Sequence, residues 1–437
     1  MTQKVVIMGA AGKDFHVFNT VYRGNAQARV VAFTATQIPG IDGRRYPASL
    51  AGDSYPDGIP IVEEERLAAL IRDEGVDHVV FAYSDVSWDY IAARRALVEA
   101  AGATFETAPI EETMIPSSRP VIAVCAVRTG CGKSQTTRKV MEILQQQGLR
   151  VVAVRHPMPY GDLAAQAVQR FATLEDLQLH HCTIEEMEEY EPHIQAGSVV
   201  YAGVDYEAIL RQAEEEADVI LWDGGNNDLP FFKPDLHITI VDPHRPGHEL
   251  SYYPGSQNLE RADVVLFNKM DTAPEAGIQE VEASVQAHNP HATVIYADSP
   301  VATEHPELVR GRRVLVVEDG PTLTHGGMTF GAGVVAARAL GCTLVDPRPW
   351  TTGTIRDTFA KYPGIGELLP AMGYSEGQIA DLEATIAATD CEAVIIGTPI
   401  DLGRLIRIDK PHTRVSYSLQ ERSGPKLESV IKAALGL

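Results

Sequence analysis

Short apolar runs alternate with segments of helical spacing along most of the chain. Runs rich in β-branched residues, typical of buried strands, are found at 29–34, 78–83, 121–126, 218–222, 263–267, 313–317 and 393–396. Helical spacing appears at 63–74 and again where Val140, Ile143 and Leu144 recur on one face. This alternation predicts an α/β fold of parallel sheets with helices on both faces.

Breaks in this pattern divide the chain into three predicted domains. Residues 112–120 contain Pro116 and Pro120 around a polar stretch and are expected to be a linker. We predict a Rossmann-like N-terminal domain over 1–118, a parallel-sheet P-loop NTPase core over 121–305 and a smaller α/β substrate-binding domain over 306–437.

The run at 121–126 leads into a turn that ends in Gly132, Lys133 and Ser134. Glycines let the backbone close around an anion, and the next helix presents unpaired N–H groups to phosphates. Lys133 is expected to hold the β- and γ-phosphates and Ser134 a magnesium ion. Val127 stands where the strict motif has its first glycine. The predicted nucleotide-binding residues of this loop are Thr129, Gly130, Cys131, Gly132, Lys133, Ser134 and Gln135.

Two later segments occur where a nucleotide-binding sheet requires them. Asp223 ends the run at 218–222 and is expected to act on magnesium through a bound water, with Gly224 and Gly225 turning past the γ-phosphate. Asn268, Lys269 and Asp271 end the run at 263–267 in the NKxD pattern that reads guanine in GTPases. The cosubstrate is therefore ATP or GTP, and guanine is favoured.

Length and composition indicate a globular protein that is long enough for two or three hydrophobic cores. The chain has 437 residues, 45% of them hydrophobic, and a formal net charge of −22. That charge disfavours nucleic acid or an anionic membrane as a partner. Five cysteines form no CxxC pair, which indicates reduced thiols. With no signal peptide at the N-terminus and no apolar run long enough to span a bilayer, we expect a cytoplasmic protein.

Two glycine-containing loops outside the core raise separate questions. Residues 9–12, GAAG, form only half of a dinucleotide fingerprint, and no acid ends the next strand, so cofactor binding there stays open. The run at 313–317 leads to a polar, glycine-rich stretch that favours a substrate site, although these glycines could serve helix packing. Its predicted substrate-binding residues are Glu318, Asp319, Thr324, His325 and Gly326.

Histidines and arginines gather after two strands of the core. Arg155, His156, His244, Arg245 and His248 are expected to form a cationic clamp for a phosphorylated substrate. A metal site is the alternative for His244 and His248, but Pro243 and Pro246 disfavour the helix that such spacing needs. The glutamates at 185–191 suggest a solvated helix face, from whose end Glu191 and His193 could reach the site.

Several segments resemble the cyclic 2,3-diphosphoglycerate synthetase family over nearly the whole chain. They are RTGCGKS, EEYEPHI, VYAGVDY, WDGGNND, LHITIVDPHRPGHE, NKMD and EDGPTLTHGGM. The resemblance implies that a nucleoside triphosphate and magnesium close an intramolecular phosphoanhydride on a small phosphorylated acid. The expected catalytic residues are Lys133, Arg128, Asp223, His244 and Arg245.

A different class of protein is the alternative. Arg128 stands where SIMIBI-class NTPases, relatives of the nitrogenase iron protein, place a lysine that contacts nucleotide across a dimer, which favours a homodimer. NKMD and the WDGG turn would equally suit a GTP-driven switch of that class that loads a metal or cofactor. Such a carrier is expected to have clustered cysteines, whereas only Cys125 and Cys131 lie near the loop.

Overall fold

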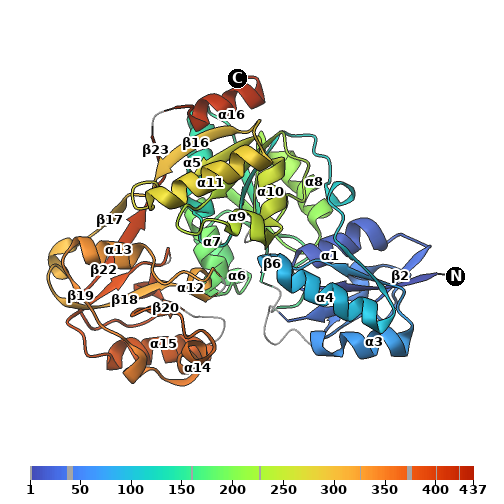
Figure 1. Ribbon diagram of the computed structural model, residues 1–437, viewed down its shortest axis with the longest axis horizontal. Coiled ribbons are helices and arrows are strands. Elements are labelled where there is room, and N and C mark those ends of the chain that lie inside the picture. Colours follow the sequence, from blue (N-terminus) through green and yellow to red (C-terminus); the bar gives the residue numbers. More distant parts are fainter. Residues whose placement is uncertain are drawn as a thin grey trace.

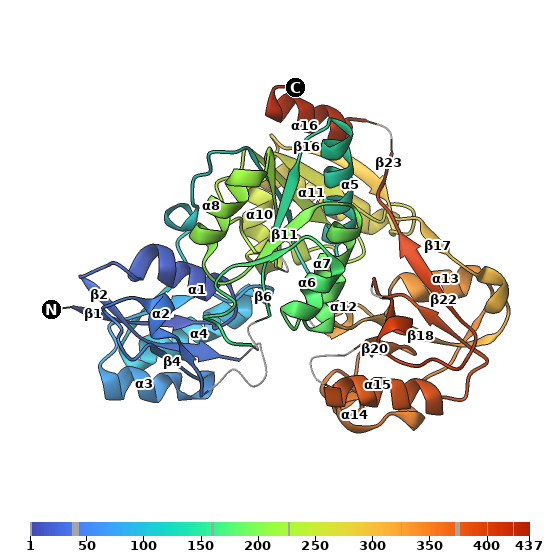
Figure 2. The ribbon, with the colours of Figure 1, turned by 180° about the vertical axis from the view of Figure 1, so that it is seen from behind.

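The computed structural model describes residues 2–36, 43–158, 161–225, 228–324, 326–371, 376–399, 401–422 and 424–437. They form three lobes, each built on its own sheet (Figure 1). The central lobe carries the phosphate loop, and the N-terminal and C-terminal lobes lie on either side below it, as the reverse view also shows (Figure 2). The prediction of a multidomain α/β fold is confirmed.

The N-terminal lobe contains a sheet in the order β3-β4-β2-β1-β5-β7. Its pairs are parallel except for β3 with β4. The strands are β1 (Gln3–Met8), β2 (Ala28–Ala35), β3 (Arg45–Tyr46), β4 (Ile59–Glu63), β5 (His78–Phe81) and β7 (Thr104–Thr107), and the α-helices are α1 (Lys13–Val17), α2 (Ala48–Ala51), α3 (Leu67–Glu74) and α4 (Trp88–Ala101). The GAAG loop joins β1 to α1, so it lies at the carboxyl edge of this sheet.

The central sheet has the order β10-β11-β9-β12-β8-β13-β15-β16-β23. Pairs from β11 to β16 are parallel, and β10 and β23 add antiparallel edges. The strands are β8 (Val121–Ala126), β9 (Val151–Arg155), β10 (Gln169–Phe171), β11 (Val199–Ala202), β12 (Val219–Gly224), β13 (Leu236–Val241), β15 (Val264–Phe267), β16 (Thr293–Asp298) and β23 (Gln420–Glu421).

Strand β8 runs through the middle of this sheet and is buried on both faces. Ile122 and Val124 pack in one hydrophobic cluster with helix α5, whereas Ala123 and Cys125 pack on the opposite face with α8. The helices of the central lobe are α5 (Lys133–Gln146), α6 (Leu174–Leu179), α7 (Ile184–Gln195), α8 (Tyr206–Glu216), α9 (His248–Ser251), α10 (Gly255–Arg261), α11 (Glu275–His288) and α16 (Leu427–Leu435). A short antiparallel pair, β6 (Val86–Ser87) with β14 (Tyr252–Tyr253), links this lobe to the N-terminal lobe.

The C-terminal lobe contains a sheet in the order β17-β22-β21-β18-β19, with β20 also paired to β18. Its strands are β17 (Val301–Thr303), β18 (Arg313–Asp319), β19 (Thr343–Leu344), β20 (Leu369–Ala371), β21 (Ala393–Ile396) and β22 (His412–Tyr417), and its helices are α12 (Gly320–Thr324), α13 (Ala332–Ala339), α14 (Gly353–Lys361) and α15 (Glu376–Ala388). Short 3-10 or π-helical turns join some elements: Phe18–Tyr22, Glu64–Arg66, Glu111–Thr113, Pro306–Leu308, Arg348–Trp350 and Leu402–Arg404.

The sheets divide the chain differently from the predicted core over 121–305 and C-terminal domain over 306–437. Strand β17 already belongs to the third sheet, because Val301 to Thr303 pair with β22. The chain then returns to the central lobe, where β23 pairs with β16 and Leu427 and Ile431 of α16 enter the central hydrophobic cluster. An amphipathic helix has no stable position until its apolar face finds a partner, and here that partner lies far back in the sequence.

Candidate active site

The phosphate loop connects the carboxyl end of β8 to the first residue of α5, Lys133. Gly130 and Gly132 have φ angles of +82° and +108°, which residues with a Cβ rarely adopt. A Cβ at Gly132 would also lie 1.9 Å from Nδ2 of Asn268. The loop therefore requires these two glycines, and the amino end of α5 presents its backbone N–H groups to an anion.

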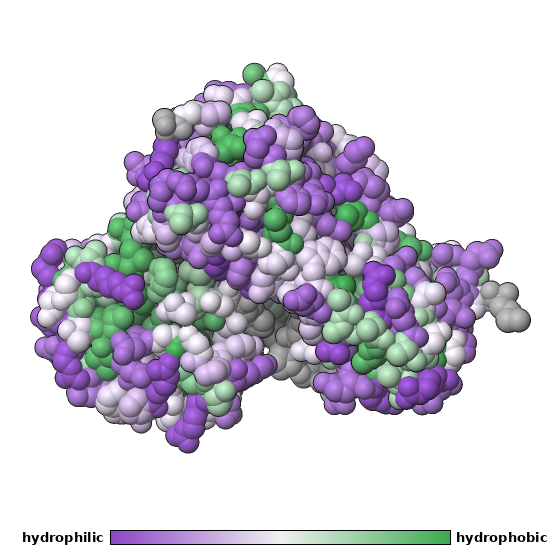
Figure 3. All heavy atoms as spheres, in the orientation of Figure 1, coloured by the Kyte–Doolittle hydropathy of each residue, from purple (hydrophilic) through white to green (hydrophobic). Residues whose placement is uncertain are grey.

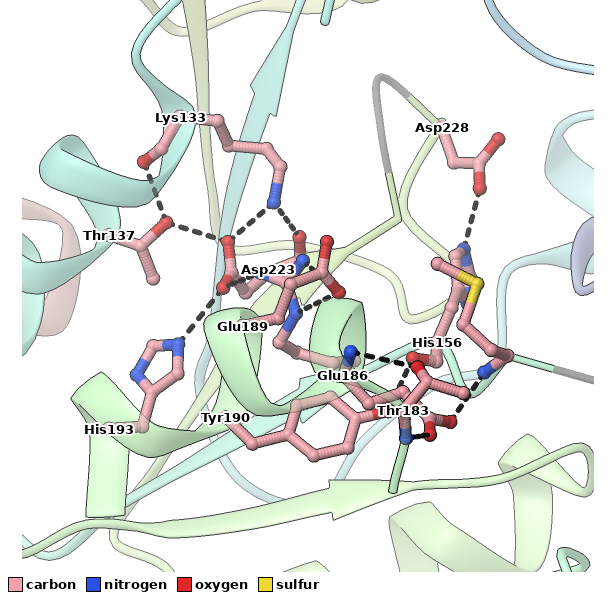
Figure 4. Close-up of polar contacts among 12 residues, drawn as sticks. Lys133, Thr137, His156, Thr183, Glu186, Glu189, Tyr190, His193, Asp223 and Asp228 are labelled. Carbon is pink, nitrogen blue, oxygen red and sulfur yellow. Dashed lines mark hydrogen bonds and ion pairs between the residues drawn. The ribbon is translucent and has the colours of Figure 1, made fainter. Parts of the chain in front are cut away.

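Asp223, at the end of β12, lies at the centre of a buried network beside this loop (Figure 4). Its Oδ1 accepts from Nζ of Lys133 at 2.7 Å and from the Thr137 hydroxyl at 2.8 Å. Its Oδ2 accepts from Arg155 and from Nε2 of His193 at 3.0 Å. Burial alone would raise the pKa of Asp223, but Arg155 and Lys133 hold it well below its usual range. The carboxylate therefore stays ionised.

The magnesium prediction joins the Ser134 hydroxyl with this carboxylate. Ser134 is exposed and lines the cavity, whereas Asp223 is buried and both of its oxygens already accept two hydrogen bonds. Magnesium prefers oxygen ligands and retains several waters. This donor set fits an ion held directly by Ser134 and phosphate oxygens, with Asp223 acting through a water. Such an ion would neutralise charge on the transferred phosphoryl group.

The NKxD segment follows β15, which is separated from β8 by β13, and it braces the phosphate loop. Asn268 donates to the carbonyl of Cys131 at 2.8 Å, and Lys269 donates to the carbonyl of Gly130 at 2.7 Å and to Asp242 at 2.9 Å. Asp271 is exposed, and its Oδ1 accepts from the backbone N–H of Ser299 at 3.0 Å. Two of the three predicted base-site residues thus hold the loop, and base reading by Asp271 stays a prediction.

Arg245 joins the phosphate loop to the C-terminal lobe. Its Nη1 donates to the carbonyls of Thr129 and Gly326, each at 2.8 Å, while its Nη2 pairs with Asp242 at 3.0 Å. A Cβ at Gly326 would lie 2.5 Å from the carbonyl oxygen of Thr322 and 3.1 Å from that of Thr129. The predicted substrate loop therefore lies directly against the phosphate loop, in close backbone approach.

The cations predicted to form one clamp have separate partners within the described residues. Arg128 pairs with Asp85 at 2.6 Å and contacts Nδ1 of His248 at 2.8 Å, which ties the phosphate loop to the N-terminal lobe. His244 contacts the Thr272 hydroxyl at 2.9 Å. Burial lowers the pKa of both His244 and His248, the latter to about 4. His156, Arg155 and His244 line the cavity, whereas His248 and Arg245 do not.

The cavity, of about 610 Å³, lies at the junction of the three lobes, and the surface is hollowed between the two lower ones (Figure 3). All three lobes contribute to its lining, which includes the GAAG loop, the phosphate loop and the start of α13. This volume is within the range of small-molecule sites. Helix α14 adds Thr354, Asp357 and Lys361, which successive turns place along one side.

One side of the cavity is an acidic wall, built from α7 and the end of β18. Its members are Glu185, Glu188, Glu189, Glu318 and Asp319. Burial, together with the nearby carboxylate of Asp319, raises the pKa of Glu188 well above its usual value and that of Glu318 to about 7. Glu189 approaches Nη2 of Arg155 at 2.6 Å, so the wall begins next to the Asp223 network (Figure 4).

Helix α7, which carries part of the wall, is buried where its run of glutamates predicts a solvent-exposed face. Glu185 and Glu186 are buried, and Glu186 caps its own helix by accepting from the backbone N–H groups of Thr183 and Met158. Glu191 pairs with Arg404 at 2.7 Å, away from the cavity. A helix of such acidity is normally exposed, and the sequence carries no signal that Met187 packs against the hydrophobic cluster of the C-terminal lobe or that Glu188 accepts a hydrogen bond from Thr398.

The other predicted residues have mixed positions. Gly130, Gly132, Gln135, Gly225 and Thr324 line the cavity, and the Thr324 hydroxyl donates to the carbonyl of Gly320. His325 lies outside the described residues. Asp14, Asp85 and Asp228 also line the cavity, although the sequence analysis did not single them out. Asp14 follows the GAAG segment and Asp228 ends the WDGGNND segment, so their positions beside known motifs were the signal available.

Comparison with known proteins identifies one closely similar curated protein. No protein-family model matches the chain. The arginine synthetase ArcE of Thermococcus kodakarensis is 57% identical over 431 residues, which cover 98% of this chain and 96% of that protein. The expected likeness to cyclic 2,3-diphosphoglycerate synthetase is not confirmed, since the name of this relative is a different one.

Similar solved structures include LpxK from Aquifex aeolicus in complex with ATP, with a TM-score of 0.45, 12% identity and coverage of 79% of this chain and 95% of that one. A ParA family ATPase from Chlorobium tepidum has a TM-score of 0.24 and 14% identity over 41% of this chain and 84% of that one.

Over the described residues no helix is both long and apolar enough to cross a membrane. The prediction of an enzyme that uses a nucleoside triphosphate is confirmed, and the chain belongs to the family of the arginine synthetase ArcE.

Proposed function

We propose that this protein is a synthetase that forms arginine at the expense of a nucleoside triphosphate. The proposal takes the product from the printed name of its relative and the energy source from the phosphate loop. The observation that carries it is the acidic wall, because arginine and its amino-acid precursors bear a cationic group that buried carboxylates bind well.

The chemistry of the product suggests the substrates. The last carbon–nitrogen bond of a guanidino group can form when ammonia replaces the oxygen of a ureido group, and citrulline is the ureido amino acid that differs from arginine in this way. Oxygen is a poor leaving group until it is phosphorylated. Transfer of the γ-phosphoryl group to that oxygen breaks the β–γ anhydride and releases the nucleoside diphosphate; ammonia then bonds to the carbon, and phosphate leaves.

The chain's own groups can be assigned to this sequence. Lys133 would leave Asp223 to contact the β- and γ-phosphates, and Arg155 would remain between Asp223 and Glu189 to face the γ-phosphate. Asp319 and Glu188 would accept hydrogen bonds from the ureido N–H groups of citrulline and would pair with the guanidinium group of arginine once it forms. On α14, Asp357 and Lys361 offer one group of each sign for an α-ammonium and an α-carboxylate.

A bisphosphorylated acid suits the cavity less well. Arg155, the cation nearest to the wall, is already paired with two carboxylates, so it offers little net positive charge to a second polyanion. The acidic wall would repel 2,3-diphosphoglycerate, whose phosphates are dianionic. Two alternatives therefore remain for the experiment to distinguish: synthesis of an intramolecular phosphoanhydride, and a GTP-driven switch.

The test measures nucleoside diphosphate release by the purified full chain with ATP or GTP. Citrulline and ammonium are supplied together and singly, with 2,3-diphosphoglycerate in a parallel reaction, and arginine is measured directly. We expect turnover and arginine only when citrulline and ammonium are both present. Turnover with 2,3-diphosphoglycerate, or no response to either substrate, would overturn the proposal.

A second measurement uses the raised pKa values of the wall. A cation that binds beside Glu318 and Glu188 stabilises their ionised forms, so arginine binding should release protons at neutral pH. Titration calorimetry of arginine in two buffers of different ionisation enthalpy reports this release. Binding with no buffer dependence would place the ligand away from the wall.

A further inference from the structure

The end of the cavity next to the N-terminal lobe contains a second set of carboxylates, away from the acidic wall. Gly12, Asp14, Ser84, His156 and Asp228 line it. They come from the loops after β1 and β5 and from two loops of the central lobe, so this end exists only where the two lobes meet. The activation step described above uses none of these side chains.

Asp228 has an unsatisfied oxygen here. The residue is 6% exposed, and its Oδ2 lies 2.6 Å from Nε2 of His156. Its Oδ1 has no hydrogen-bond partner among the described residues. In Figure 4 this second oxygen points away from His156. An unpaired carboxylate oxygen is costly to bury, so a hydrogen-bond donor that binds in the cavity would find a ready partner.

His156 is held so that Asp228 stays in position. The imidazole contacts the Tyr206 hydroxyl through Nδ1 and packs against the ring of Phe231, with 4.9 Å between centroids. Glycines make room for it, because a Cβ at Gly225 would lie 2.1 Å from His156 Cδ2. Both imidazole nitrogens are thus engaged, and Asp228 is the group left to meet a ligand.

Charges of both signs meet at this end of the cavity. Lys13 also lines it, with its Nζ 3.2 Å from the Tyr253 hydroxyl. Burial would raise the pKa of Asp228, but His156, Lys13 and Ser84 together lower it, so Asp228 is an ionised carboxylate. Asp14 faces the same end of the cavity and is near enough for Asp228 to raise its pKa further, after the larger effect of burial. Two carboxylates and one unused oxygen together favour a small cation that donates hydrogen bonds.

We propose that Asp228 binds the nitrogen nucleophile of the synthetase reaction, which arrives as ammonium. This inference rests on the proposed function and deepens it, since it gives the second substrate a place separate from the amino acid. Ammonium must lose one proton before its lone pair can attack carbon. Asp14 can accept that proton as its carboxylate becomes a carboxylic acid, because burial raises the pKa of Asp14 to about 7. The ammonia then bonds to the ureido carbon that bears the phosphorylated oxygen, and phosphate departs as that carbon–oxygen bond breaks.

The test compares Asp228→Asn with wild type, with Asp218→Asn as the control variant. Asp218 is an aspartate of the same lobe that pairs with Arg150 at the surface, outside the cavity lining. Rates of arginine formation are measured against ammonium, citrulline and nucleotide in turn. We expect Asp228→Asn to raise the KM for ammonium about tenfold or more, while the KM values for citrulline and nucleotide change less than about twofold.

The outcomes separate the two proposals. An unchanged KM for ammonium in Asp228→Asn, or an equal rise of all three KM values, overturns this inference alone. Wild-type protein with no ammonium-dependent arginine formation overturns the proposed function and this inference together. If Asp228→Asn melts below wild type and the control, Asp14→Asn provides the second variant: it should lower kcat with ammonium and leave nucleotide KM unchanged, and a normal kcat would overturn the proton acceptor.

Discussion

The network around Asp223 and the acidic wall use charged residues in opposite ways, although they touch through Glu189. In the network, Lys133, Arg155 and His193 surround Asp223, so its cations are largely neutralised. In the wall, Glu189 is the carboxyl group that pairs with Arg155, and burial raises the pKa of Glu188, Glu318 and Asp319. The charges of the Asp223 network therefore balance one another before a ligand arrives, whereas the negative charge of the acidic wall would be balanced by a cationic ligand.

This contrast suggests that the Asp223 network responds to the nucleotide and that the acidic wall responds to the amino acid. A nucleotide must exchange the contact between Lys133 and Asp223 for contacts with its phosphates, so its binding rearranges existing pairs. On the proposed function, arginine would add a positive charge to a region built of carboxyl groups. Substitutions in the two regions should therefore change different kinetic constants.

The largest effect is expected from Lys133→Ala. Because the lysine supports charge on the transferred phosphoryl group, its removal should lower nucleotide turnover by more than about a hundredfold. Asp223 keeps its hydrogen bonds from Arg155, His193 and Thr137, so the fold should persist. Lys139→Ala, on a partly exposed residue of the same helix that pairs with Glu142, is the control. A mutant that retains a tenth of wild-type turnover would remove the phosphate-loop assignment.

Asp319→Asn tests the other side of the comparison. Asparagine keeps an oxygen for the Thr322 hydroxyl and removes one charge from the wall. We expect the KM for citrulline to rise about ten- to a hundredfold, with the nucleotide KM nearly unchanged. Steady-state kinetics measure this split, and Asp346→Asn, at a surface pair with Arg348, is the matched control. A rise in nucleotide KM instead would place Asp319 in the phosphate site.

Glu318→Gln tests the acidic wall through the pH dependence of the free energy of unfolding. The native pKa of Glu318, about 7, exceeds the ordinary 4.5, so the native state holds its proton longer than the unfolded state. Stability should therefore fall as pH rises from 4.5 to 7, by about 3 kcal/mol for this group. Denaturant unfolding at several pH values should show that loss relative to Glu318→Gln, but not relative to Glu307→Gln at an exposed site. Parallel curves for wild type and Glu318→Gln would contradict it.

The smallest effect is expected from Asp271→Asn with ATP. Asp271 is exposed and lies outside the cavity lining, so the Kd for ATP should change less than about threefold. Calorimetry with GTP completes the test. A loss of about tenfold for GTP, with a gain for xanthosine triphosphate, would support guanine reading by the NKxD segment.

The phosphate loop could be predicted from sequence because its chemistry is local. Gly130, Gly132 and Lys133 occupy adjacent positions, and the strand before them and the helix after them have their own periodicity. The cations near the γ-phosphate were also visible as residues. The ion pairs that neutralise these cations could not be predicted. Asp223 and Arg155 lie on different strands, β12 and β9, and only the sheet order shows that these strands are neighbours.

The acidic wall could not be predicted for a related reason. Glu188 and Asp319 are far apart in the chain, and on a helix rich in glutamate burial is a tertiary outcome that no local pattern records. The same holds for Asp228, whose unsatisfied oxygen becomes apparent only when both lobes are in place. The return of β23 and α16 to the central lobe depends on the pairing of β23 with β16, a strand far back in the sequence.

That return gives the C-terminal lobe an unusual attachment. Asp298, where the chain leaves the central sheet, is paired with Gln420, where it comes back. The lobe is therefore a cassette inserted into a hairpin, and both of its connections leave from one point. A short turn that joins these two neighbours would excise the lobe and leave the order of the central strands unchanged. Rotation about the same point would move Glu318 and Asp319 of the wall relative to the three glutamates on α7, which belong to the central lobe.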